Sequence, residues 1–221
     1  GLLLAREWLA AMDVTLDAQD LIELAITLEG HGDNVVAALT GGVTVTVKGE
    51  QRCFWQRLCV TEYPALVLAI PETWGYTVNA RRLLPSSVPY ADAVYNSAHA
   101  ALLIAALSSC NYELLGEAMR DRLHEPYREQ IYPWLSNARA AALEAGAYGV
   151  SLSGAGPSMV AFVPVNNCSA VMRALEAAYH EDGFKVNVYR AAVTGGAVSR
   201  TVILTGNDVS ASSWSGLEET G

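Results

Sequence analysis

The 221-residue chain is poor in basic residues, and this shortage limits its partners. It has 14 Lys and Arg against 23 Asp and Glu, which gives a formal net charge of -9. The basic residues are scattered along the chain instead of clustered. A surface that neutralises a phosphate backbone needs clustered cations. We therefore expect no nucleic-acid partner.

The chain also lacks cysteine motifs and long apolar runs. The spacing of Cys53, Cys59, Cys110 and Cys168 matches neither a zinc knuckle nor a C-x-x-C redox pair. Free thiols indicate a reducing compartment, so we expect a cytoplasmic protein. The apolar opening 2–5 is far shorter than a membrane span and has no basic flank, so we expect no membrane association.

The sequence has no initiator Met and no N-cap residue ahead of its first periodic residues, so we expect it to begin inside a helix. Apolar residues make up 52%, enough for a substantial core. Periodicity predicts an α+β chain. Helices are expected at 2–12, 17–28, 34–39, 90–107, 112–123, 135–145 and 169–179, strands at 43–47, 58–60, 66–70, 150–153, 159–163 and 185–191, and an aperiodic tail after 204.

The segment 29–35 places polar groups at a turn before a helix: Glu29, His31, Asp33 and Asn34. Carboxylates, an imidazole and an amide crowded in this way can hold a divalent cation and orient a polar substrate. The alternative is an ordinary helix start, in which Asp33 or Asn34 is the N-cap and the histidine is exposed. The spacing alone leaves both open.

Two further segments carry arginines. The segment 77–85 predicts a short helix with Arg81 and Arg82, and Arg128 follows a proline at the start of a helical turn in 125–128. Arginine suits bidentate binding of a carboxylate or phosphate. The alternatives are a solvated helix face for the first segment and a structural role for Arg128.

The segment 151–158 places Gly154 and Gly156 among hydroxyl residues between two predicted strands. Glycines let backbone amides approach an anion or substrate closely. The alternative is a plain hairpin. The segment is not a Walker loop, because no Lys-Ser or Lys-Thr follows the glycines.

Together and in this order, the four segments resemble the homoserine kinases of the GHMP small-molecule kinase superfamily. That family shows Glu-Gly-His-Pro-Asp-Asn-Val with Gly-Gly and a strand, Thr-x-x-Ala-Arg-x-x-Leu-Pro, Tyr-Arg before a proline, and Ser-Gly-Ala-Gly-Pro-Ser/Thr. The resemblance runs from about Leu2 to Val198. Asp-Asn-Val and Ala-Arg-x-x-Leu-Pro favour homoserine kinases over mevalonate or galactose kinases. Gly32 stands where the family usually has proline, which leaves the placement of His31 less fixed.

The resemblance implies the two-lobe GHMP kinase fold. Residues 1–62 would be the remainder of an incomplete N-lobe resembling ribosomal protein S5 domain 2, and 63–204 a ferredoxin-like α+β C-lobe. Residues 205–221 would be a flexible tail. The family's Gly-Leu-Gly-Ser-Ser phosphate loop would lie before Gly1, so we expect a truncated chain that is inactive by itself.

The activity that the resemblance implies is transfer of the γ-phosphoryl group of ATP to the hydroxyl of L-homoserine, with Mg²⁺, for threonine biosynthesis. It implies Glu29 as the Mg²⁺ ligand, Thr77 near the transferred group, His31 and Asn34 in the amino-acid pocket, Arg81 and Arg128 on the substrate carboxylate, Gly154 closing the site, and Ser153, Gly156, Pro157 and Ser158 supporting that loop. A homodimer is also possible. The alternatives are a non-catalytic amino-acid-binding remnant and another GHMP kinase with a small alcohol substrate.

Overall fold

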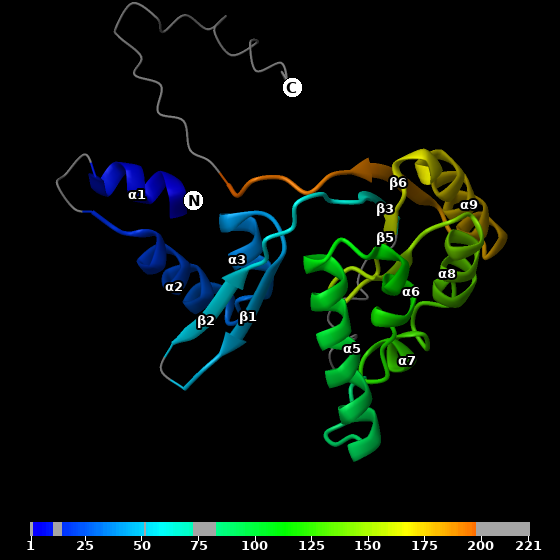
Figure 1. The fold of residues 1–221 in the computed structure, drawn as a ribbon, viewed down its shortest axis with the longest axis horizontal. Coiled ribbons are helices and arrows are strands. Elements are labelled where there is room, and N and C mark those ends of the chain that lie inside the picture. The colour runs from blue at the N-terminus through cyan, green and yellow to red at the C-terminus, as the bar shows by residue number, and fades with distance from the viewer. Residues whose placement is uncertain (1, 11–14, 51, 73–82, 198–221) are drawn as a thin grey trace, which may run out of the picture. The chain divides into compact units, whose positions relative to one another are not determined.

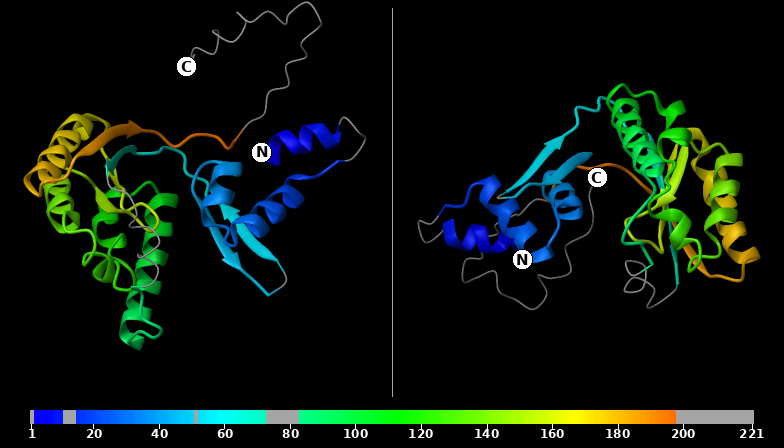
Figure 2. Two further views of the ribbon diagram at one scale, coloured as in Figure 1. Left: turned by 180° about the vertical axis from the view of Figure 1, so that it is seen from behind. Right: turned by 90° about the horizontal axis from the view of Figure 1, so that it is seen from below.

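The computed structural model describes residues 2–10, 15–50, 52–72 and 83–197. The chain forms two compact units (Figures 1 and 2). The first comprises Gly1–Gly41, Thr46–Trp55 and the chain from Gly196, and the second comprises Gly42–Val45 and Gln56–Gly195. The lobe boundaries expected from the sequence stay a prediction.

The first unit contains the helices α1 (Leu2–Ala10), α2 (Ala18–Glu29) and α3 (Asp33–Thr40). Helix α2 begins where the sequence predicts, because the Asp17 carboxylate accepts the Asp20 N–H at 2.8 Å while the Asp20 carboxylate accepts the Asp17 N–H at 3.2 Å. The helix ends at Gly30, whose φ of +87° suits glycine. Strands β1 (Thr44–Lys48) and β2 (Cys53–Arg57) pair as a two-stranded sheet.

The second unit is built on a four-stranded antiparallel sheet in the order β4-β5-β3-β6. The strands are β3 (Ala65–Pro71), β4 (Gly149–Leu152), β5 (Met159–Val163) and β6 (Val186–Ala191). In β3, Val67 pairs with Ala161 of β5 on one side and Arg190 of β6 on the other. Alternate residues of β3 are fully buried, as expected for an internal strand with a packed face.

Helices cover both faces of this sheet. On one face, α8 (Leu135–Glu144) and α9 (Cys168–Glu181) lie side by side and share a core with Ala161 and Val163 (Figure 1). Phe162, between those two residues in β5, packs instead with α5 (Tyr90–Ser108) and α6 (Leu115–Ala118). Residues alternate between the faces of a strand, so β5 contributes to two separate cores. A 3-10 turn (Tyr112–Leu114), α7 (Glu125–Arg128) and a second 3-10 turn (Val165–Asn167) complete the unit.

Two expectations from the sequence are wrong. Residues 58–60 form no strand, and the strand is Cys53–Arg57 instead. The apolar side chains of Leu58 and Val60 pack on the core that α5 forms with α6, here called the α5 core. This contact explains why these residues are apolar without being in a strand. The helix expected at 112–123 ends at Ala118, because backbone N–H groups farther along bond to the Asp121 side chain. The helix expected in 77–85 lies outside the described residues up to 82, and residues 83–85 are not helical. The tail after 204 also lies outside the described residues.

The remaining predicted helices and strands that fall within the described residues are confirmed, with ends shifted by a few residues. Among the described helices, none has the length and apolar character needed to cross a membrane.

Candidate functional site

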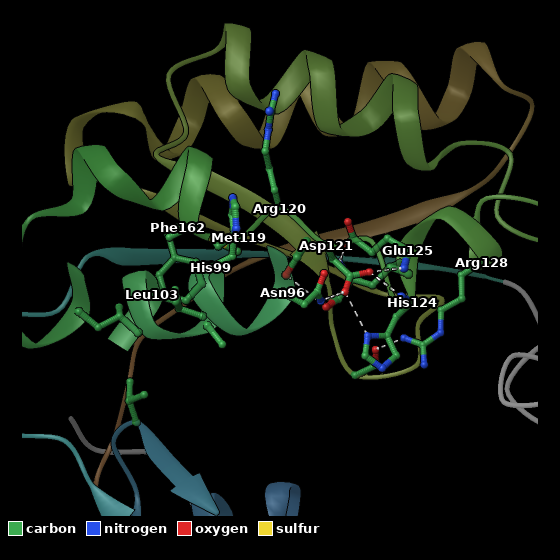
Figure 3. Close-up of a pocket in the computed structure, with 17 residues that line it drawn as sticks. Asn96, His99, Leu103, Met119, Arg120, Asp121, His124, Glu125, Arg128 and Phe162 are labelled. Carbon is green, nitrogen blue, oxygen red and sulfur yellow. Dashed lines mark hydrogen bonds and ion pairs between the residues drawn. The ribbon is translucent and has the colours of Figure 1, made fainter. Parts of the chain in front are cut away.

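A cavity of about 430 Å³ in the second unit lies between α5, the α6–α7 segment and the sheet (Figure 3). Figure 3 shows His124, Glu125 and Arg128 at one end of this cavity, with Leu103 and Phe162 toward the other. The cavity therefore has a polar end and an apolar end.

Arg128 is the cationic group of the polar end. It is only 8% exposed, and its Nη1 donates to the carbonyl oxygen of Gly154 at 3.0 Å. Its Nε is buried and has no hydrogen-bond partner among the described residues. Burying a guanidinium N–H group without a hydrogen-bond acceptor costs free energy of folding. A carboxylate or phosphate is the kind of acceptor that matches guanidinium geometry.

The loop between β4 and β5 is held by hydrogen bonds within the loop and by the hydrogen bond from Arg128 of α7. The Ser153 N–H donates to Ser158 O at 2.8 Å, and the Gly156 N–H donates to Ser153 O at 3.0 Å. Tyr132 adds a hydroxyl donated to Ala155 O at 2.9 Å. The hairpin expected as an alternative is present, since β4 and β5 pair directly. It is a hairpin whose loop carbonyls are fixed by Arg128 and Tyr132.

Glu125 lies one turn before Arg128 on α7 and is 8% exposed. Its Oε1 accepts the backbone N–H of Leu152, the last residue of β4, at 2.9 Å. Its Oε2 accepts from Nη2 of Arg139 on α8. One buried carboxylate thus joins three elements next to the loop.

Asp121 precedes α7 and accepts from several donors. Its Oδ1 accepts from the Asn96 side chain at 2.6 Å, and its Oδ2 accepts the N–H groups of His124 and Glu125, both at 2.6 Å. Burial alone would raise the pKa of Asp121, but these hydrogen bonds and one from the His124 ring outweigh it and hold the pKa well below its ordinary value. The ionised carboxylate therefore fixes the start of α7.

Replacing Asp121 by asparagine is expected to lower stability at pH 7 by about 1 kcal/mol, because hydrogen bonds to an ionised acceptor are stronger than hydrogen bonds to a neutral amide. The folded-state pKa is depressed, so the stabilisation by the wild-type carboxylate is present above about pH 4 and is lost as the pH falls below it. Urea unfolding of both proteins at pH 7, 5 and 3 should show that the difference between their free energies of unfolding becomes smaller at acid pH. A constant difference would contradict this role.

The motif of the first unit forms a compact polar group around His31. Nδ1 of His31 lies 2.6 Å from Oδ1 of Asp33, and Nε2 lies 3.8 Å from Oε1 of Glu29. Asp33 also accepts the Asn34 N–H at 2.9 Å. The N-cap of α3 is Gly32, which makes no side-chain bond, while the Asp33 side chain satisfies one of the first backbone amides of the helix, as the alternative expected. No cluster of three or more His, Cys, Asp or Glu is placed to hold a metal ion in the described part of the chain.

The structure thus groups the expected site residues in two sets. Arg128 and the 153–158 loop meet in the second unit, while Glu29, His31 and Asn34 lie together in the first. That these two sets serve one site stays a prediction. Thr77 and Arg81 lie outside the described residues.

Sequence reasoning did not select six polar residues that line the cavity: Asn96, His99, Arg120, Asp121, His124 and Glu125. The spacing of Asn96 and His99 on α5 was an available signal, since residues three apart share one helix face. The role of Glu125 depends on Leu152 and Arg139, which no local pattern reveals.

The family model described as GHMP kinases C terminal matches residues 103–181, which include Arg128 and the loop. Curated relatives are the homoserine kinases of Gloeobacter violaceus (43% identical over 178 residues, 79% of this chain and 57% of the relative) and Caldanaerobacter subterraneus (35% over 190 residues, 86% and 60%). The chain spans about three fifths of the length of these relatives.

Solved structures give the same result. The homoserine kinase of Cytophaga hutchinsonii superposes with a TM-score of 0.78 at 26% identity, covering 86% of this chain and 62% of that one. The mevalonate kinase of L. major has a TM-score of 0.64 at 19% identity, over 89% and 64% of the two chains, which indicates a shared fold alone. The α+β GHMP kinase fold expected from the sequence is therefore confirmed. The chain is thus similar to homoserine kinases over the part that it shares with them, and its residues 103–181 match the GHMP kinase C-terminal family model.

Proposed function

We propose that this chain is part of an ATP-dependent kinase that phosphorylates the hydroxyl of L-homoserine to give O-phospho-L-homoserine, in threonine biosynthesis. The observation that carries the proposal is Arg128, a buried guanidinium whose Nε lacks a partner among the described residues. Arg128 lines the cavity, so a substrate carboxylate bound there would be an acceptor for its guanidinium group. The similarity to homoserine kinases supports homoserine as the molecule that carries this carboxylate.

Arg128, together with Arg81, binds the carboxylate and orients the hydroxyl toward the nucleotide. Gly154 and the loop 153–158 close the amino-acid site, and Thr77 lies near the transferred group. Phosphoryl transfer depends on positioning and charge neutralisation more than on covalent help from the protein. We therefore assign no general base.

The nucleotide side of the site is assigned to Glu29. The amino-acid pocket is assigned to His31 and Asn34. The Glu29 side chain is 52% exposed, so its carboxylate can reach an ion. Mg²⁺ is commonly held by one or two carboxylates plus substrate phosphates, which fits a single protein carboxylate such as Glu29. When bound, the ion neutralises charge on the phosphates.

The same proposal includes a cytoplasmic location, a homodimer, and lobes at 1–62 and 63–204. The four cysteines are free, in keeping with a reducing compartment.

The test measures L-homoserine binding by calorimetry and homoserine-dependent ADP formation. The chain is used by itself and joined to the N-terminal part of the Gloeobacter violaceus relative. We expect binding in both forms and turnover in the joined form. Binding without turnover in either form would favour an amino-acid-binding remnant, and turnover only with other small alcohols would favour a different GHMP kinase. Absence of homoserine binding in both forms would refute the proposal.

A further inference from the structure

We propose that Glu125 is a positioning residue that sets the Arg128 guanidinium against the 153–158 loop and thereby determines affinity for the substrate carboxylate. This inference rests on the proposed function, because it assumes that Arg128 receives that carboxylate. Glu125 itself does not touch the substrate.

The contacts of Glu125 fix both partners of the Arg128–Gly154 hydrogen bond. Glu125 and Arg128 belong to the same single-turn helix α7. The Leu152 N–H bonds to Glu125 Oε1 at 2.9 Å, and Gly154 follows two residues later. The carboxylate therefore holds helix and strand in the register in which Nη1 of Arg128 reaches Gly154 O at 3.0 Å. With Nη1 so engaged, Nε and the rest of the guanidinium keep one orientation.

A four-residue helix cannot hold this orientation by itself, because short helices depend on tertiary contacts. Asp121 fixes its start through backbone N–H groups, but it makes no bond to the loop among the described residues. Glu125 supplies the connection to β4 and, through Arg139, to α8.

The chemistry of the pair also suggests a role in positioning. The side chains of Glu125 and Arg139 are 10% and 25% exposed, so their pairing has a desolvation cost. Buried ion pairs are often no more stabilising than apolar residues of similar size. Their directional hydrogen bonds, in contrast, define one arrangement of the elements that they join.

The matched control is Glu129. Its Oε1 lies 3.5 Å from Nη1 of the same Arg139, but it makes no bond to Leu152 among the described residues. Glu129→Gln thus weakens a contact of Arg139 and leaves the connection to β4 in place.

The experiment compares Glu125→Gln with Glu129→Gln in the form of the protein that turns over. We expect Glu125→Gln to raise KM for L-homoserine roughly 10- to 100-fold. The kcat should be nearly unchanged, because the weakened interaction stabilises the bound substrate and the transition state equally. Glu129→Gln should leave both values near wild type. In an Arg128→Ala background, Glu125→Gln should add little to the loss in kcat/KM, because the group it positions is gone. Equal losses in both backgrounds would mean a merely structural role and would overturn the inference.

Hydrogen exchange without ligand separates this inference from the proposed function. The Ser153 and Gly156 amides, which bond within the loop, should exchange faster in Glu125→Gln than in wild type or Glu129→Gln. Faster exchange in a protein that never binds homoserine would refute the proposed function and support the positioning. If Glu125→Gln shows the exchange rates of the wild type and an unchanged KM for L-homoserine, the positioning role of Glu125 is wrong. If Glu125→Gln does not fold, Glu125→Asp, whose shorter carboxylate cannot span both contacts, is judged by the same outcomes.

Discussion

Alanine in place of Arg128 is expected to weaken L-homoserine binding by about 2–5 kcal/mol, which is roughly 30-fold to several thousand-fold. The substrate carboxylate would lose its charged donor inside a largely buried site. The Gly154 carbonyl would also lose the donor that lies 3.0 Å away. Calorimetric titration with L-homoserine measures this loss directly.

Two further variants make the result specific. Arg128→Lys keeps the charge but not the planar fork, so an intermediate loss is expected. Arg173→Ala removes an exposed arginine from α9, which does not line the cavity, and should bind homoserine as wild type does. If Arg128→Ala binds homoserine with unchanged affinity, Arg128 is not the carboxylate ligand.

Alanine in place of Gly156 is expected to destabilise the protein by about 2–4 kcal/mol, from backbone strain and overpacking together. Gly156 has a φ of +79°, and an added Cβ would lie 2.6 Å from Cε2 of Tyr132. Tyr132 is fully buried among aromatic residues of the core, so it has little room to move. Urea unfolding at neutral pH measures the change.

Gly154→Ala is the control for this effect. Gly154 has a similar φ of +60°, but no atom lies within 4 Å of an added Cβ. Only the backbone strain remains, so the expected cost is about 1–2 kcal/mol. Equal destabilisation by both substitutions would show that contact with Tyr132 does not matter.

Much of this fold could be predicted from the sequence, because local chemistry decides many element ends. Asp17 and Asp20 form a reciprocal cap, and Gly30 takes the left-handed conformation that ends the same helix. The glycine-rich segment at 153–158 was correctly placed between two strands. The site role of Arg128 could be inferred only from a family resemblance, since one arginine after a proline is not distinctive.

The sequence misled where distant contacts decide. Leu58 and Val60 are apolar because they cover the α5 core, and not because they extend a strand. The helical pattern after Ala118 is interrupted by the Asp121 side chain, whose partners include Asn96 on another helix. The buried state of Glu125 likewise depends on Arg139 and Leu152. Such contacts exist only once the second unit has folded.

The strand order of the second unit has a consequence for its folding during synthesis. Strand β3 leaves the ribosome well before its neighbours β5 and β6, which come from far later in the chain, with Leu66 opposite Phe162 and Ala191. Until they emerge, the backbone edges of an apolar strand stay without partners. Pairings of such long sequence separation form slowly. Nascent chains halted before β6 should therefore be the form of this protein that most depends on chaperones.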